Sequence, residues 1–183
     1  MDDLQVIERI SAGDSRAFEQ LVRHYQRPLF HYLGRMGLSA GETEELAQET
    51  FLRAFQHLHK FEPERALFST WLFTIARRLA LNLLDRHRHA QKFALQREVE
   101  TAGPAPHDSY DQAQIRRRID AGLRQLPLKY RSPLALAYLE EMSITEIARI
   151  EGCAEGTVKS RIHRAKLQLK TLLADLLGDN DHA

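Results

Sequence analysis

The sequence of 183 residues contains a single cysteine, Cys153. One cysteine cannot form an internal disulfide or a cysteine-rich zinc site, and it is compatible with a reducing compartment. The longest uncharged stretch of note, Ala66–Ala76, is far shorter than the roughly 20 apolar residues of a membrane span. The opening MDDLQVIERI lacks the basic segment and apolar run of a secretory signal. We therefore expect a cytoplasmic protein without membrane insertion.

The sequence also lacks an excess of charge of either sign. Its 26 Lys and Arg residues and 25 Asp and Glu residues leave a formal net charge of +1. Bulk charge therefore indicates neither a nucleic acid nor a membrane surface as partner, so any such signal must be local. Hydrophobic residues make up 43% and charged residues 28%, a balance typical of globular chains. This length allows one ordinary domain or two small ones.

No strand pattern occurs, whereas apolar residues recur at the three- and four-residue steps of amphipathic helices. The pattern predicts a short helix closed at Gly13 and a longer one over 14–36, bent at Pro28. Ser39 and Glu42 form a capping box that should open a third helix. The buried stripe of this third helix is expected to contain Ala47, Phe51, Ala54, Phe55 and Leu58.

A fourth helix is expected after the break at Phe61–Pro63, with Ser69 or Thr70 as its N-cap. Phe73 is expected to be buried, whereas Trp71 could lie in the core or at the surface. The inward residues should be Leu72, Ile75, Ala76, Leu79 and Leu83. The first part of the chain is thus predicted to be a small helical bundle.

A shift in composition divides the chain. Residues 91–112 include AGPAP, several charges and no sustained apolar period, which is typical of a flexible linker. Roughly twenty unstructured residues inside one compact domain would be unusual. The predicted fold is therefore all-α, with two small helical domains, 1–90 and 113–177, and a polar tail, 178–183. The second domain should open with helices over 115–126 and 130–142.

The second domain is predicted to end in a helix-turn-helix. Ser143 and Glu146 form another capping box, which opens a short helix. A helix-turn-helix needs a small residue at the helix crossing, a turn residue that tolerates positive φ, and an apolar anchor. Ala148, Gly152 and Val158 supply these in that order.

The last helix is basic along its N-terminal half, with no acidic residue from Thr157 to Lys170. Cations and short polar donors at the start of such a helix suit the major groove of DNA. Spacing and charge together favour DNA binding, and the alternative is a solvated basic face. The five cations are Lys159, Arg161, Arg164, Lys166 and Lys170.

Two further surfaces carry a functional signal. Between Gly41 and Thr50 the third helix has acidic residues and no basic one, so it forms either a solvated face or a site for a basic partner. From Phe61 to Arg88, aromatic residues precede arginines. Exposed rings beside cations can bind single-stranded nucleic acid, although aromatics at helical spacing mostly belong to the core.

Three segments in this order resemble the extracytoplasmic-function class (group 4) of bacterial RNA polymerase sigma factors. They are EELAQETFLRAF at 44–55, FSTWLFTIARRLALNLL at 68–84 and SITEIARIEGCAEGTVKSRIHRAKLQL at 143–169. The resemblance covers nearly the whole chain. It implies two helical domains on a flexible linker that bind core polymerase and direct promoter-specific initiation by reading the −35 element and reading and melting the −10 element.

The resemblance also implies roles for individual residues. Polymerase binding, on the coiled coil of the β′ subunit, falls to Glu45, Gln48, Glu49 and Leu52. Contact with the −10 element falls to Phe61, Phe68, Ser69, Trp71, Arg78, Asn82 and Arg86. Contact with the −35 element falls to Thr157, Lys159, Ser160, Arg161, His163 and Arg164. The implied partners are core polymerase, through the β′ coiled coil and the β flap, promoter DNA and an anti-sigma factor.

The chain departs from the family pattern at the turn. Glu151 stands where an apolar residue usually packs, and Ala154 stands where a capping Ser or Pro is common. Either the turn is looser, or Ile150 and Cys153 fill the gap. Cys153 itself is expected to be a buried structural thiol rather than a redox sensor.

Other function classes find less support. The pairs His57/His59 and His87/His89 point to opposite sides of a helix and cannot share a metal. No P-loop, G-x-S-x-G or H-E-x-x-H motif occurs, so we expect no enzyme, cofactor or metal. A response regulator would need alternating strands and helices in the first 90 residues. A purely protein-binding adaptor would leave the basic helix unexplained.

Overall fold

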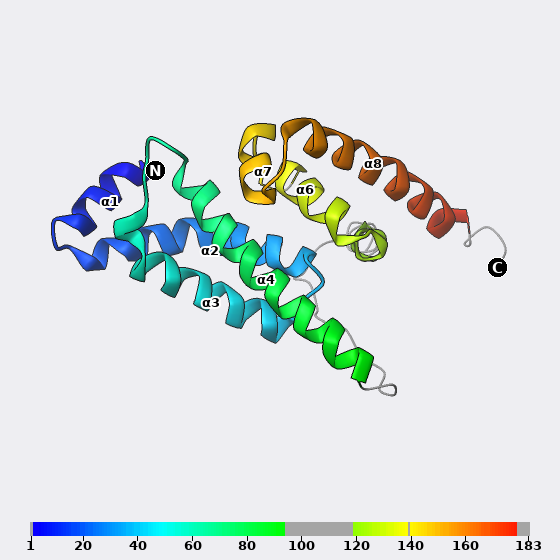
Figure 1. Cartoon of the computed structure of the whole chain (residues 1–183), viewed down its shortest axis with the longest axis horizontal. Helices are drawn as coiled ribbons and strands as arrows, with labels where there is room; N and C mark the ends of the chain where they lie inside the picture. Colours follow the sequence, from blue (N-terminus) through cyan, green and yellow to red (C-terminus); the bar gives the residue numbers. More distant parts are fainter. Residues whose placement is uncertain (1, 94–118, 139, 179–183) are drawn as a thin grey trace. The chain divides into compact units, whose positions relative to one another are not determined.

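The computed structural model describes residues 2–93, 119–138 and 140–178 (Figure 1). The described residues contain helices and turns and no strand, as the all-α prediction requires. The chain divides into two compact units. The N-terminal unit comprises Met1–Gly34 and Leu38–Glu100, and the C-terminal unit comprises Arg35–Gly37 and Thr101–Ala183. Most of the predicted linker, 94–112, and the tail, 179–183, lie outside the described residues.

The helices of the N-terminal unit follow the predicted order. Asp2 caps the first one, accepting hydrogen bonds from the backbone N–H groups of Leu4 and Gln5 at 3.1 and 3.4 Å. The helix expected from residue 14 starts as a 3₁₀ turn and runs through Pro28. The elements are α1 (Asp3–Ser11), η1 (Ser15–Ala17), α2 (Phe18–Arg35), α3 (Ala40–Gln56), η2 (Leu58–Lys60) and α4 (Phe68–Phe93).

The capping box at the start of α3 forms as predicted. The Ser39 backbone N–H donates to Oε2 of Glu42 at 2.8 Å, and the Glu42 backbone N–H donates to the Ser39 hydroxyl oxygen at 3.3 Å. Nε2 of His87, on α4, lies 3.0 Å from Oε1 of Glu42. Burial alone would raise the pKa of Glu42, but the Ser39 hydrogen bonds and the charge of His87 outweigh it and lower the pKa.

The core of the N-terminal unit is rich in aromatic side chains. Tyr32 of α2 packs on Phe73 of α4 with ring centroids 5.4 Å apart, and both rings are buried, which confirms the prediction for Phe73. The expected N-cap of α4 is wrong, because the helix already begins at Phe68 and includes Ser69 and Thr70. The Trp71 backbone N–H bonds to a carbonyl one turn earlier, at Leu67. Ile75 and Leu83, expected to point inward, are only half-buried.

The C-terminal unit contains a helical segment at 119–125 and three further helices, α6 (Leu128–Tyr138), α7 (Ile144–Glu151) and α8 (Glu155–Gly178). Helices α6 and α7 both pack on α8, and α6 also contacts α7. Leu136, Ile147 and Val158, one from each helix, are fully buried in this core. Nowhere in the described part of the chain is a helix both long enough and apolar enough to span a membrane.

Candidate nucleic-acid interface

The helix-turn-helix forms as the sequence predicts. The capping box of Ser143 and Glu146 opens α7, with the Ser143 backbone N–H 2.9 Å from Oε2 of Glu146. Gly152 ends the helix in the left-handed conformation with φ of +65°, where a side chain would be strained. The Cys153 backbone N–H reaches the Ala148 carbonyl at 3.1 Å. These bonds close a tight turn of the Schellman type, so the looser turn is not observed.

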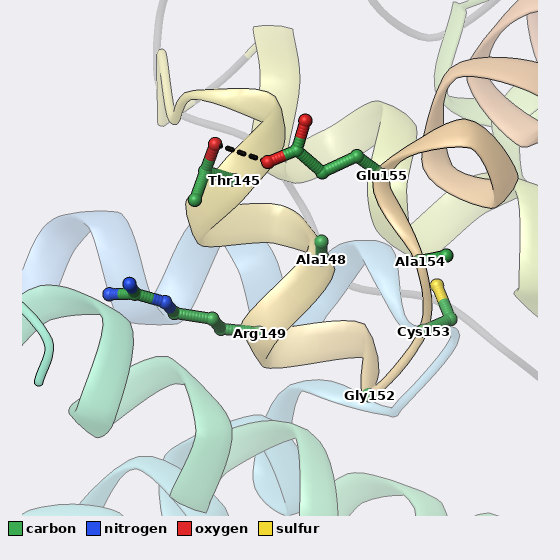
Figure 2. A pocket seen from close by; sticks show the side chains of 7 residues that line it. All are labelled: Thr145, Ala148, Arg149, Gly152, Cys153, Ala154 and Glu155. Atoms are coloured by element: carbon green, nitrogen blue, oxygen red, sulfur yellow. Dashed lines mark hydrogen bonds between the residues drawn. The ribbon is translucent and has the colours of Figure 1, made fainter.

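A hydrogen bond ties the first turn of α7 to the first turn of α8. The Thr145 hydroxyl donates to Oε1 of Glu155 at 2.6 Å, as Figure 2 shows. Beneath it, the depression beside the turn includes Ala148, Gly152 and Cys153. Cys153 is half-buried and its thiol lies 3.7 Å from Nη1 of Arg161. The angle between the two helices is thus held by bonds on both sides of the turn.

The exposed side of α8 carries most of the residues expected to contact the −35 element. Val158, Ile162 and Ala165 form the buried stripe of α8. Thr157 is half-buried, and the Ser160 hydroxyl bonds to its carbonyl at 2.9 Å. The exposed members of the expected set are Lys159, Ser160, His163 and Arg164.

Arg161 does not share this exposed side. Its Nη1 lies 3.3 Å from Oε2 of Glu151, whose side chain is 0% exposed. The Ser132 hydroxyl, on α6, donates to the other carboxylate oxygen of Glu151 at 2.6 Å. Glu151 therefore occupies the position where the family usually packs an apolar residue. Its carboxylate is buried there with an ion pair and a hydrogen bond. The contact between Arg161 and the −35 element stays a prediction; in this structure its Nη1 group is directed at Glu151.

A group that the sequence analysis missed lies next to Arg164. A hydrogen bond from Arg164 to the Tyr130 hydroxyl lowers the pKa of Tyr130, and the charge of Lys129 adds to the effect. Nζ of Lys129 lies 5.0 Å from the centroid of the Tyr130 ring. Two cations and a phenol thus gather where α6 begins. No local pattern indicates this group, because Arg164 is distant from the other two in sequence.

The acidic side of α3 is open to solvent. Glu45 and Gln48 are exposed, and Glu49 is half-buried and bound to Nε of Arg53 at 2.6 Å. Leu52 lies among these residues with 51% of its surface exposed. Exposed leucine surrounded by polar groups is typical of a protein-binding surface when it belongs to a larger patch.

Phe55, near Leu52 on α3, is not buried as predicted. Phe55, assigned to the buried stripe of α3, is 42% exposed and contacts the ring of Phe18 edge-on at 5.1 Å. Its position follows directly after Ala54, which is fully buried. One residue along a helix rotates the side chain by about 100°, so Phe55 lies at the edge of the stripe and extends the apolar area near Leu52.

The −10 set divides into a buried and an exposed part. Phe61 and Phe68 are 9% and 2% exposed, so their rings lie in the core of the unit, and their contact with the −10 element stays a prediction. Both pack on Trp71, at centroid distances of 5.5 and 5.8 Å. Trp71 and Ser69 are half-buried. The exposed members, Arg78, Asn82 and Arg86, follow at four-residue steps and share one side of α4.

The described residues contain no group of three or more His, Cys, Asp or Glu side chains that could hold a metal ion. Asn82 and Arg86 interact with each other, because Nε of Arg86 donates to the Asn82 backbone carbonyl at 3.4 Å.

Two family models match the chain in succession. Sigma-70 region 2 matches residues 21–90, and Sigma-70 region 4 matches residues 116–169. The chain is 35% identical to the RNA polymerase sigma-H factor of Pseudomonas aeruginosa, covering 97% of this chain and 96% of that protein. It is 31% identical to the ECF RNA polymerase sigma factor SigW of Bacillus subtilis, covering 93% of this chain and 96% of that protein.

Solved structures share the fold. The sigma factor RpoE in complex with the anti-sigma factor NepR, from Bartonella quintana, superimposes with a TM-score of 0.73 at 26% identity, covering 86% of this chain and 96% of that one. CnrH in complex with the cytosolic domain of CnrY superimposes with a TM-score of 0.71 at 24% identity, covering 93% and 96%. The second likeness concerns the fold alone.

Proposed function

Because the chain belongs to the extracytoplasmic-function family of sigma factors, which bind RNA polymerase core and direct promoter-specific transcription initiation, we propose how its surfaces divide that task. The N-terminal unit, with a boundary near residue 90, binds core polymerase and the −10 element. The C-terminal unit, from about residue 113, binds the −35 element and the β flap. The observation that carries this division is that the two units expose different chemistry, an acidic and apolar side on α3 and a basic side on α8.

The polymerase-binding surface is the side of α3 formed by Glu45, Gln48, Glu49 and Leu52. Its support is the exposed leucine among carboxylates, which fits a partner helix with basic and apolar residues such as the β′ coiled coil. Gln48→Ala combined with Glu49→Ala should weaken core binding at least tenfold in a fluorescence titration. Glu8→Ala, which removes an exposed carboxylate from α1, is the control. Wild-type affinity in the double variant would contradict this docking surface.

The −10 element is contacted by one side of α4. Trp71, Arg78, Asn82 and Arg86, with Ser69 and the preceding loop from residue 60, supply a ring, cations and an amide for an unstacked strand. Phe61 and Phe68 support Trp71 from within the core. Arg78→Ala should reduce open-complex formation, measured with 2-aminopurine in the melted region. Arg27→Ala, an exposed cation of α2, should have no effect, and equal losses in both variants would contradict the assignment.

The −35 element is contacted by Thr157, Lys159, Ser160, His163 and Arg164. The support is that the last four are exposed at the start of a helix whose opposite side is buried, the arrangement of a recognition helix. If Arg164 binds a guanine, Arg164→Ala should cost about 1–3 kcal/mol of binding and relax specificity at that base. If it binds phosphate, the salt dependence should fall instead. No change in either quantity would remove Arg164 from the interface.

The protein acts as a binding subunit in the cytoplasm, without a catalytic site, and an anti-sigma factor controls it. The support for the last point is that a relative of the same fold, RpoE, was solved with the anti-sigma factor NepR. Such a partner would cover the polymerase-binding and DNA-binding sides, as the sequence resemblance implies. Copurification from the native host with mass spectrometry should recover a protein that competes with core polymerase. Failure to compete would contradict this mode of control.

A further inference from the structure

A polar contact crosses the interior of the helix-turn-helix and links three helices. Glu151, the last residue of α7, binds Arg161 of α8 at 3.3 Å and accepts a hydrogen bond from Ser132 of α6 at 2.6 Å. Ser132 and Glu151 are buried, and Arg161 is 27% exposed. Buried carboxylates are costly unless they are paired and hydrogen-bonded. Here each carboxylate oxygen has its own donor, and the donors come from two different helices.

The position of Arg161 on α8 explains why it can make this contact. It follows Val158 by three residues and precedes Ala165 by four, so it flanks the buried stripe on the side of α7. Lys159 and His163 lie two residues to either side and are exposed. Arg161 is thus placed between the core and the surface that would meet DNA, and its charge is already engaged by Glu151.

We propose that Arg161 is a positioning residue rather than a DNA contact, and that Glu151 and Ser132 hold it so that α8 presents its exposed side in one orientation. The proposal rests on the proposed function of α8 in binding the −35 element. It assigns recognition to Lys159, Ser160, His163 and Arg164 and orientation to the three linked residues. The apolar side chain expected at position 151, between α7 and α8, is replaced by a carboxylate with a partner on each side.

Removing one partner of the contact among Ser132, Glu151 and Arg161 differs physically from replacing all three by apolar side chains. Arg161→Met leaves the Glu151 carboxylate buried without its cation, which should disturb the junction of the two helices. The triple variant Ser132→Ala, Glu151→Leu, Arg161→Met removes all the polar groups together. Replacing a buried ion pair by apolar groups of similar size is often neutral or stabilising. The triple variant should therefore restore the orientation, although it lacks the Arg161 charge.

The experiment uses holoenzyme made from the full chain and core polymerase. A promoter library randomised in the upstream region, selected with wild-type holoenzyme, supplies the preferred element, and a scrambled template is its partner. Affinity for both is measured over a series of salt concentrations for wild type, Arg161→Met, the triple variant and Arg164→Ala. Core binding and thermal unfolding are measured in parallel, so that a variant that fails to fold is recognised.

The expected result has two parts. Arg161→Met should lose at least tenfold in discrimination between the templates, and the triple variant should return to within about threefold of wild type. The triple variant should also keep the wild-type salt slope, whereas loss of a phosphate contact lowers the slope by about one. Restored discrimination with an unchanged slope supports a positioning role.

Two results would overturn the proposal. The first contradicts the positioning role alone, and the second also contradicts the proposed function of α8. If the triple variant lacks discrimination although it is folded, or if its salt slope falls by about one, Arg161 contacts DNA itself and only the positioning role fails. If the wild-type holoenzyme selects no upstream element from the library, the proposed function of α8 fails and the positioning role fails with it.

Discussion

The two units are both small helical bundles, but their cores differ in composition. In the N-terminal unit the largest fully buried side chains are Tyr32, Phe68 and Phe73, which contact other rings. In the C-terminal unit the buried set is aliphatic and includes the bond between Glu151 and Arg161. Aromatic side chains bury a large apolar area, whereas a buried carboxylate needs a cation and hydrogen-bond donors to offset its desolvation. Ring contacts are thus prominent in the N-terminal interior, whereas the C-terminal interior combines aliphatic packing with one charged contact between helices.

The largest expected effect comes from the aromatic core. Phe73→Ala removes a ring that is 1% exposed, and it should lower the free energy of unfolding of the N-terminal unit by about 3–5 kcal/mol. Trp71 is the only tryptophan of the chain, so its fluorescence during urea unfolding reports on this unit. Leu67→Ala, at a position 62% exposed, should change little. A loss in Phe73→Ala as small as the one expected for Leu67→Ala would contradict the role of Phe73 in the core.

A smaller effect is expected from the C-terminal ion pair. Glu151→Leu deprives Arg161 and Ser132 of their acceptor, and the loss of a hydrogen-bonded charge should cost about 2 kcal/mol. Hydrogen exchange of α7 and α8 amides measures this loss, while the Trp71 transition should not move. Combining Glu151→Leu with Ser132→Ala and Arg161→Met should recover most of the stability. If the single and triple variants are equally unstable, the pair contributes packing rather than a charge contact.

The two capping boxes offer a matched comparison between the units. The backbone N–H of each serine lies 2.8 or 2.9 Å from its glutamate, and the return bonds are both 3.3 Å. Ser39→Ala and Ser143→Ala should therefore cost about 1 kcal/mol each, through loss of one N-cap acceptor. Hydrogen exchange at the first turns of α3 and α7 tests both. A cost confined to one unit would mean that tertiary packing holds the other helix start.

The smallest expected effect is a pH dependence at the first box. The pKa of Glu42 is lowered in the folded state from its ordinary value of 4.5, so the folded protein holds the carboxylate charged more readily than the unfolded chain does. Its stabilisation is present above about pH 4.5 and is lost as the pH falls through the folded pKa. The stability difference between wild type and Glu42→Gln should shrink between about pH 6 and about pH 3. A constant stability difference over this pH range would contradict a stabilising contribution from the lowered pKa of Glu42.

Much of the fold follows from local chemistry that is visible in the sequence. Capping boxes at Ser39 and Ser143 satisfy the free N–H groups of their own helix, and Gly152 supplies its own left-handed turn. The periodic stripe of Val158, Ile162 and Ala165 also follows from the geometry of a single helix. For these features the interacting groups lie within a few residues of each other, so spacing alone predicted the helices and the helix-turn-helix.

The directions of several side chains on the candidate surfaces depend on contacts between helices, which no local sequence pattern reveals. Whether Phe55 is exposed and Phe68 buried is decided by where the neighbouring helices pass. The direction of the Arg161 side chain depends on Glu151, ten residues away, which is in turn bound by Ser132 from another helix. Side chains at the edge of a helical stripe can turn either way at little local cost, and their direction is set by the partner that the assembled helices bring within reach.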